Sequence, residues 1–115
     1  MRVLVCGGRG FGNDTLLFGT LNSHHKRRPI TALIHGGASG ADRMAALWAV
    51  DKGIPHTRFL PDWKRHGKAA GPIRNARMIA EGKPDLVIAF PGGRGTANMI
   101  AQAKQAGIEV VIVIE

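Results

Sequence analysis

The stretch from Pro84 to Thr96 reads PDLVIAFPGGRGT and joins a short apolar run to a glycine-rich turn. Residues 86–90 are apolar without alternation, and a proline stands close to each end. This pattern is typical of a strand that is buried on both faces of a sheet. Apolar residues at helical spacing follow as far as Gly107, so we expect a helix whose first turn is capped by Thr96. The sequence predicts a buried strand, a tight loop and a helix in direct succession.

Three glycines, at positions 92, 93 and 95, remove side chains from the loop after this strand. The backbone can turn tightly there and leave amide hydrogens exposed, close to the positive end of the helix that follows. Such a place suits a phosphate group, although the motif alone also fits a sharp turn without a ligand. We predict that this loop binds a ligand through Pro91, Gly92, Gly93, Arg94, Gly95 and Thr96.

Two further loops have the same design. The mostly apolar residues 2–6 precede GGRGFG at positions 7–12, and the mostly apolar residues 30–34 precede HGGASGAD at positions 35–42. In the first loop, Asn13 stands where a P-loop has lysine and where the dinucleotide-binding motif has glycine. We therefore exclude a P-loop nucleotide hydrolase and a standard NAD-binding domain. The predicted ligand-binding residues of these two loops are Gly7, Gly8, Arg9, His35, Gly36 and Gly37.

Two residues of the second loop have more than one interpretation. His35 stands at the end of a predicted strand, where it either contacts the ligand or makes a hydrogen bond within the protein. Asp42 has capping-box spacing to Ser39, and it is also the one carboxylate that we nominate as catalytic. The five histidines do not show the spacing of metal ligands, and we predict no metal and no cofactor.

Residues 61–70 form the longest irregular stretch, which is polar and basic and contains one aromatic residue, Trp63. It follows a third predicted strand over residues 54–60 and resembles a lid or rim. Trp63 either stacks on a base, as aromatic side chains do in nucleotide sites, or anchors the loop to the core. The sequence does not decide between the two.

A helix is expected to begin at Gly71-Pro72, since proline is favoured in a first helical turn. Its first turn carries Arg74 and Asn75, which we predict to be ligand-binding residues. Arg77 and Glu81 are one turn apart and predict an ordinary surface ion pair.

The order of these elements indicates an α/β fold. Residues 109–114 form a fifth strand, and five strands separated by helices predict a parallel sheet with helices on both faces, in the order 3-2-1-4-5. The loops after strands 1, 2 and 4 then share the carboxyl edge of the sheet, where such folds bind ligands. We expect one ligand site and one domain over residues 1–115. Among the core candidates are Leu17, Leu21, Leu47 and Trp48.

The composition favours a phosphate-rich partner. Sixteen lysines and arginines against eight acids give a formal net charge of +8, which suits a nucleotide or a nucleic acid. No apolar stretch approaches the roughly 20 residues that span a bilayer. The single cysteine, Cys6, and the absence of a leader pattern lead us to expect a cytoplasmic protein without a membrane partner. The oligomeric state stays open, with a homodimer among the alternatives.

Three motifs together carry a family resemblance. They are HGGAxGAD at 35–42, DWxxxGKxAGPxRN at 62–75, and the stretch from Asp85 to PGGRGT at 91–96. In this combination the chain resembles the YspA-type (cpYpsA-related) branch of the SLOG superfamily, which also contains the LOG phosphoribohydrolases and the DNA-processing protein DprA. The resemblance implies a Rossmann-like three-layer sandwich that binds a nucleotide or a nucleotide-derived ligand. It also implies a bacterial or phage source.

The chain departs from the LOG enzymes at one position that matters for catalysis. LOG enzymes continue from the PGGxGT motif to a catalytic glutamate, and Met99 stands there in this chain. A protein of this kind is either a nucleotide sensor or an enzyme, for which hydrolysis of a nucleotide derivative is the reaction class considered. The alternative from a different class is a single-stranded nucleic-acid-binding protein similar to DprA.

Overall fold

A parallel five-stranded sheet forms the centre of the protein in the computed structural model, which describes residues 1–115. Its strands follow the order β3-β2-β1-β4-β5, as the sequence predicts. The strands are β1 (Arg2–Cys6), β2 (Ala32–His35), β3 (His56–Arg58), β4 (Leu86–Ala89) and β5 (Glu109–Ile112).

The strand register brings the ends of the central strands to one edge of the sheet. Leu4 of β1 is level with Ile34 of β2, and Cys6 of β1 is level with Ala89 of β4. The predicted carboxyl edge, at which Cys6, His35 and Phe90 stand next to one another, is therefore confirmed. The loops that follow β1, β2 and β4 all leave the sheet at this edge.

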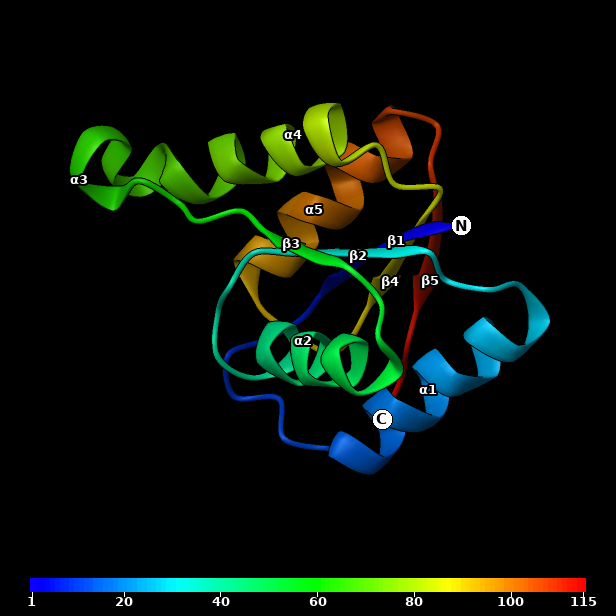
Figure 1. Cartoon of the computed structure of the whole chain (residues 1–115). Coiled ribbons are helices and arrows are strands. Elements are labelled where there is room, and N and C mark those ends of the chain that lie inside the picture. Colours follow the sequence, from blue (N-terminus) through cyan, green and yellow to red (C-terminus); the bar gives the residue numbers. More distant parts are fainter.

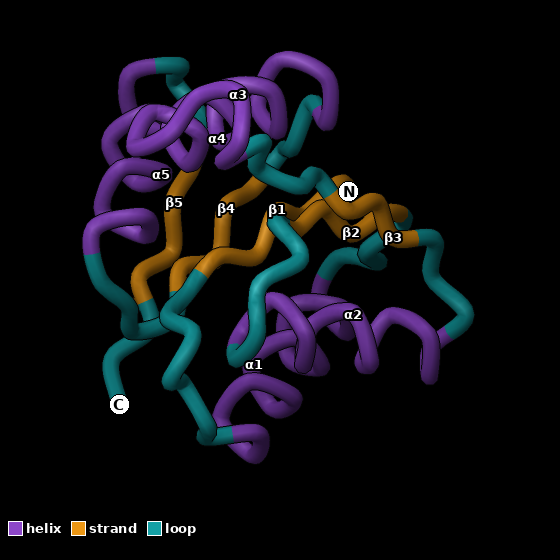
Figure 2. The backbone as a smooth tube through the Cα atoms, turned by 90° about the vertical axis from the view of Figure 1, so that its left-hand side faces the viewer, coloured by secondary structure: helices purple, strands orange, loops and turns teal.

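The helices cover both faces of the sheet and produce three layers (Figures 1 and 2). One face carries α1 (Asp14–Arg27) and α2 (Ala41–Lys52), and the other carries α4 (Ala70–Gly82) and α5 (Arg94–Gln105). The chain thus has the Rossmann-like sandwich that the resemblance implies. Between β3 and α4 it forms the short helix α3 (Trp63–His66) and the 3-10 turn η1 (Gly67–Ala69), where the sequence pattern predicts an irregular stretch.

Each face of the sheet packs against its helices through a separate apolar cluster. Val3 and Val5 of β1 belong to the cluster under α1 and α2, whereas Leu4 and Cys6 belong to the cluster under α4 and α5. This division follows from the alternation of side chains along a strand. It explains why β4 and residues 3–6 of β1 are entirely apolar: both of their faces are buried.

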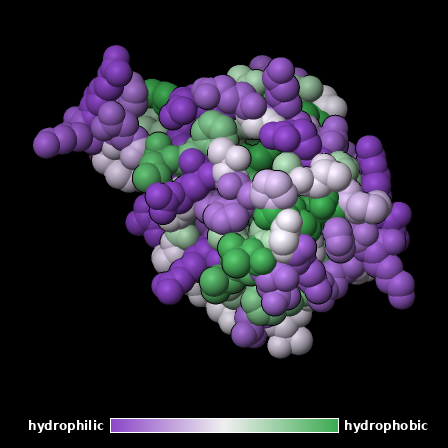
Figure 3. All heavy atoms as spheres, in the orientation of Figure 1, coloured by the Kyte–Doolittle hydropathy of each residue, from purple (hydrophilic) through white to green (hydrophobic).

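The packing of α2 differs from the prediction. Trp48 is buried, but Leu47 is 57% exposed, so its placement in the core was wrong. The helix packs closely through Ala45 and Ala49, which turns Leu47 and Val50 to the solvent. Figure 3 shows the resulting apolar patch over α2.

Several element boundaries also differ from the predicted ones. The third strand is limited to residues 56–58, and Pro55 and Phe59 on either side of it each make one further backbone hydrogen bond to β2. The helix α5 begins at Arg94 with Gly93 at its N-cap, so the prediction that Thr96 caps it was wrong. The predicted ion pair of Arg77 and Glu81 is present at 3.0 Å. No helix has the length and apolar character needed to span a membrane.

Candidate functional site

The loops after β1, β2 and β4 pack directly against one another at the carboxyl edge of the sheet. The amide of Gly8 donates a hydrogen bond of 2.9 Å to the carbonyl of Pro91. A Cβ on Gly8 would lie 3.1 Å from the Cα of Gly92, and one on Gly40 would meet the carbonyls of Gly8 and Arg9. These glycines are therefore required for the contact between the loops. Their presence is explained by this packing and does not by itself indicate a ligand.

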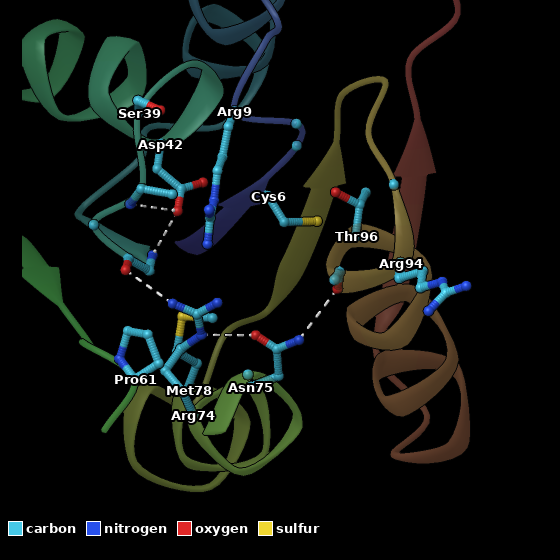
Figure 4. A pocket seen from close by; sticks show the side chains of 18 of the residues that line it. Cys6, Arg9, Ser39, Asp42, Pro61, Arg74, Asn75, Met78, Arg94 and Thr96 are labelled. Atoms are coloured by element: carbon cyan, nitrogen blue, oxygen red, sulfur yellow. Dashed lines mark hydrogen bonds between the residues drawn. The ribbon is translucent and has the colours of Figure 1, made fainter. Parts of the chain in front are cut away.

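The three loops surround one cavity of about 780 Å³ at this edge (Figure 4). The volume lies within the range of about 300–1,000 Å³ that is usual for small-molecule sites. Its lining contains most of the residues that the sequence singled out, and the exceptions are His35, Pro91 and Gly92. The predicted residues in the lining are Gly7, Gly8, Arg9, Gly36, Gly37, Asp42, Arg74, Asn75, Gly93, Arg94, Gly95 and Thr96.

Asp42 holds the second glycine loop in shape from the first turn of α2. Its Oδ2 atom accepts hydrogen bonds from the amides of Gly36 at 3.1 Å and Ala38 at 3.2 Å. The predicted capping box is absent, because Gly40 is the N-cap of α2 and makes no side-chain bond. Asp42 reaches back to the loop instead of capping its own helix.

His35, which does not line the cavity, holds the same loop through a hydrogen bond. Its Nδ1 atom accepts a hydrogen bond of 3.0 Å from the amide of Gly37, and its Nε2 atom lies 3.1 Å from Nδ1 of His56. Because Nδ1 accepts, the proton of neutral His35 is on Nε2 and is donated to His56. Burial, followed by the nearby His56 and Arg58, lowers the pKa of His35 to about 4. Of the two interpretations of His35, the geometry favours the hydrogen bond within the protein.

Arg74 and Asn75 connect the two sides of the cavity. Nη1 of Arg74 donates to the carbonyl of Gly36 at 2.9 Å, and Nε donates to Oδ1 of Asn75, also at 2.9 Å. Asn75 is buried, and its Nδ2 donates in turn to the carbonyl of Gly95 and to Oδ1 of Asn98. Asn75 therefore positions Arg74 and the start of α5, and its polar atoms are already bonded.

The first turn of α5 offers unbonded amides to the cavity. The amides of Arg94, Gly95 and Thr96 have no acceptor within the protein, as expected at a helix start without a capping side chain. A Cβ on Gly93 or Gly95 would meet no atom within 4 Å. The backbone here is open to the cavity, in contrast to the tightly packed Gly8 and Gly92.

Three arginines of the cavity have no carboxylate partner. Only one ion pair within 4 Å occurs in the protein, that of Arg77 and Glu81 outside the cavity. Arg9 extends from its loop into the space between Asp42 and Arg74, whereas the guanidinium of Arg94 points away from that space (Figure 4). With Asp42 as the one acid among them, the lining carries an excess of positive charge.

Burial dominates the protonation behaviour of the site. It lowers the pKa of Arg74, which the charge of Asp42 opposes and the charge of Arg9 reinforces. It raises the pKa of Asp42 to about 6, although the bonds from Ala38 and Gly36 and the charge of Arg74 act in the other direction. It also raises the pKa of the Cys6 thiol to about 12, with Asp42 as the second cause. Cys6 is thus a neutral thiol at physiological pH. The protein contains no cluster of three or more His, Cys, Asp or Glu side chains that could hold a metal ion.

The lining also contains residues that the sequence did not single out for the site. The apolar residues among them have no functional group that would mark them as ligand-binding in the sequence. Only Trp63 gave a signal, as an aromatic residue within a basic loop. The additional lining residues are Val5, Cys6, Ala38, Ser39, Leu60, Pro61, Trp63, Gly71 and Met78.

The sequence comparisons identify the family. The model of the YspA, cpYpsA-related SLOG family matches residues 1–66. The chain belongs to this family. A relative from Mycobacterium phage D29, the Gene 61 protein, is 39% identical over 118 residues that cover 96% of this chain and 94% of the relative. The predicted family resemblance is confirmed, and it supports a role in nucleotide or nucleic-acid binding at the level of the family.

Two solved structures share the fold. MurG from Acinetobacter baumannii matches 96% of this chain with a TM-score of 0.61 at 16% identity, and DNA processing protein A (DprA) from Streptococcus pneumoniae matches 96% with a TM-score of 0.54 at 17% identity. The chain spans 34% of MurG and 58% of DprA. At this identity the likeness concerns the fold and not the site.

Proposed function

We propose that the cavity at the carboxyl edge of the sheet binds a nucleotide or a nucleotide-derived ligand, with a phosphate group at the first turn of α5. The observation that carries the proposal is the set of unbonded amides from Arg94 to Thr96, which belong to residues that line a cavity rich in arginine. A helix N-terminus combines free N–H donors with a positive dipole end. Family membership adds a reason to expect a nucleotide as the source of the phosphate.

Of the loops that open onto the cavity, the one before α5 is the best suited to the phosphate. In the second loop, the amides of Gly36 and Gly37 already bond Asp42 and His35. In the first loop, the amide of Gly8 bonds the carbonyl of Pro91. The predicted contacts of Gly36 and Gly37 with the ligand therefore do not involve their amides in this arrangement.

Arg9 and Arg74 supply the positive charge around the phosphate. Hydrogen bonds to charged groups contribute about 1.5–3 kcal/mol each, and a guanidinium suits phosphate geometry. Arg74 has limited freedom because Gly36 and Asn75 fix its position, whereas Arg9 reaches in from the first loop without a bond to the protein. Arg94, at the rim, acts on the ligand mainly through its amide.

If the protein is an enzyme, Asp42 is the residue that we assign to catalysis. It lies in the lining, and a carboxyl with a pKa of about 6 can exchange a proton near neutral pH. Met99 occupies the LOG-like position and is buried in the apolar cluster under α5, so it contributes nothing to a reaction in the cavity. Without a reaction, the same site acts as a nucleotide sensor.

A single-stranded nucleic acid is the second candidate ligand. The net charge of +8 and the half-exposed Trp63 at the cavity favour it, since such proteins combine basic grooves with aromatic platforms. Its affinity would fall steeply with salt, because each phosphate contact releases counterions. The cytoplasmic location and the single domain over residues 1–115 stay predictions, and a homodimer stays one of the alternatives for the oligomeric state.

Isothermal titration calorimetry with AMP tests the proposal. Gly93→Val adds a β-branched side chain where the protein leaves open space, and the φ of Gly93, −101°, is not in the left-handed region that favours glycine. We expect this variant to fold and to lose AMP binding. Gly19→Val on α1, which also meets no atom within 4 Å, is the matched control and should bind as the wild type does. Wild-type affinity in folded Gly93→Val would overturn the proposal.

A further inference from the structure

The cavity has an apolar wall that the phosphate-binding end does not use. It consists of Leu60, Pro61 and Trp63 before α4, together with Gly71 and Met78 of α4; we call it the apolar wall. Pro61 and Met78 lie on the side of the cavity away from Ser39, Asp42 and Thr96 (Figure 4). Arg74 lies beside Pro61 and Met78 (Figure 4), so a guanidinium borders the apolar wall.

Two large side chains of the apolar wall are half exposed although the protein has an apolar core to bury them in. Leu60 is 53% exposed and Trp63 is 50% exposed. Burying apolar surface contributes roughly 25 cal/mol per Å², so leaving it open next to a binding cavity is unfavourable without a ligand. Exposed apolar surface beside polar groups commonly marks a binding site.

Both side chains pack against other residues of the cavity lining. The side-chain oxygen of Asp62 caps α3, which begins at Trp63, by accepting from the amide of Arg65 at 3.1 Å. The indole lies over Gly71, with its Cη2 atom 3.8 Å from the position of a Cβ there. Leu60 lies over Gly37, where its Cδ2 atom would be 2.7 Å from a Cβ. The wall is thus a supported surface that is open on one side.

We infer that the apolar wall binds the planar base of the ligand and that the base stacks on Trp63. The inference rests on the proposed function, because it is the phosphate at α5 that places a base within reach of the wall. A planar heteroaromatic ring is the occupant that fits an indole and two aliphatic residues beside an arginine-rich site.

The wall also determines which property of the base is recognised. None of its residues except Trp63 has a polar side-chain atom, and the nearby Asn75 has both ends of its amide bonded to the protein. Discrimination between bases needs donors and acceptors that are left unpaired by the wrong base. The site therefore recognises the presence of a base and discriminates weakly among adenine, guanine, cytosine and uracil.

Fluorescence titration tests this inference, because the chain has two tryptophans in different environments. Trp48 is 3% exposed and its indole N–H donates to Asn22 at 2.8 Å, so a ligand in the cavity changes the emission of Trp63. The probes are AMP, GMP, CMP, UMP and ribose 5-phosphate, and calorimetry follows the variants. We expect the four nucleotides to bind within about fivefold of one another, and ribose 5-phosphate to bind about ten- to hundredfold more weakly, in line with the strength of base stacking.

Variants of Trp63 separate stacking from phosphate binding. Trp63→Ala should weaken AMP binding about ten- to hundredfold and leave ribose 5-phosphate unaffected, whereas Trp63→Phe should retain most of the AMP affinity. Leu47→Ala, which removes an exposed apolar side chain outside the cavity, should change neither. AMP binding that is insensitive to Trp63→Ala, or a preference above tenfold for one base, would overturn the inference alone. Absence of binding for all five probes would overturn the proposed function and this inference with it.

Discussion

Arg74 on α4 donates a hydrogen bond of 2.9 Å to the carbonyl of Gly36, which belongs to the loop after β2. The amide of the same Gly36 donates to Asp42, and Arg74 bonds Asn75, which reaches the carbonyl of Gly95. One chain of hydrogen bonds thus crosses the cavity from α2 to α5. The positions of the charged groups in the candidate site depend on one another through this chain.

Replacing the glycines of the site by alanine should lower the free energy of unfolding at some positions and leave it unchanged at others. A Cβ on Gly92 would clash with the side chain of Thr96 and lie 2.7 Å from the amide nitrogen of Gly8, whereas one on Gly93 would meet nothing. We expect Gly92→Ala to lower the free energy of unfolding by about 1–3 kcal/mol, the usual cost of overpacking. Gly93→Ala should leave it nearly unchanged. Urea denaturation measures both, and equal stability of the two variants would contradict the assigned contact between the loops.

The two arginines at either end of the cavity should contribute unequally to phosphate binding. Arg9 points into the cavity and Arg94 points away (Figure 4). Arg9→Ala should weaken AMP binding by about 1.5–3 kcal/mol, the strength of a charge-assisted bond. Arg94→Ala should weaken it by about 1 kcal/mol or less, as for an exposed charge. Arg28→Ala, at the end of α1, controls for the loss of net charge in the same calorimetric experiment.

Asp42 should make stability depend on pH in a direction opposite to most aspartates. Its pKa is raised from 3.8 to about 6 in the folded protein, so folding takes up a proton between these values. The free energy of unfolding of the wild type, relative to that of Asp42→Asn, should rise as the pH falls from about 7 to about 4. From the shift, the rise is about 2 kcal/mol by pH 4 and approaches about 3 kcal/mol only below the unfolded pKa of 3.8.

The asparagine variant isolates this effect from that of His35. An asparagine oxygen still accepts from Gly36 and Ala38 but carries no charge. His35, whose pKa is lowered to about 4, stabilises the fold above about pH 6.5 and loses that contribution as the pH falls toward 4. The histidine is present in both proteins and cancels in the difference. Denaturation at several pH values that gives a constant difference would refute the assignment to Asp42.

The protein should not hydrolyse AMP in the manner of the LOG enzymes. Cleavage of an N-glycosidic bond builds positive charge on the sugar. A nearby carboxylate either stabilises this charge or activates the water that attacks the sugar. The residues after Thr96 are Ala97, Asn98 and a buried Met99, none of which ionises. Chromatography of free adenine after incubation with AMP should show no release above a buffer blank. Release that disappears in Asp42→Asn would instead identify Asp42 as the acid.

Much of the fold could be predicted from the sequence because β1, β2 and β4 each end at a glycine-rich loop. Apolar runs that stop at glycine loops, such as Leu86–Ala89 before Gly92, place the strand, the loop and the helix at once. The topology then follows from rules of handedness and connection. The apolar face of α2 was harder, because Ala45 and Ala49 allow a close approach that turns Leu47 outward.

The site was predictable in its residues but not in their bonds. The glycine loops indicated the right edge of the sheet, yet the sequence could not show that Asp42 bonds backward to Gly36. Nor could it show that His35 holds its loop through a hydrogen bond. Both depend on side-chain directions that tertiary packing decides. Of the apolar wall, only Trp63 was singled out by the sequence, because leucine, proline and methionine are common in any core.

Amide chemical shifts test the central claim most directly. In a titration of the ¹⁵N-labelled protein with AMP, a phosphate at the start of α5 should shift the amide resonances of Gly93, Arg94, Gly95 and Thr96 most strongly. The amides of Gly36 and Gly37, which are bonded to Asp42 and His35, should shift less. Inorganic phosphate at higher concentration should affect the same α5 amides. Saturable shifts confined to other parts of the chain, or no shifts at millimolar AMP, would contradict the account.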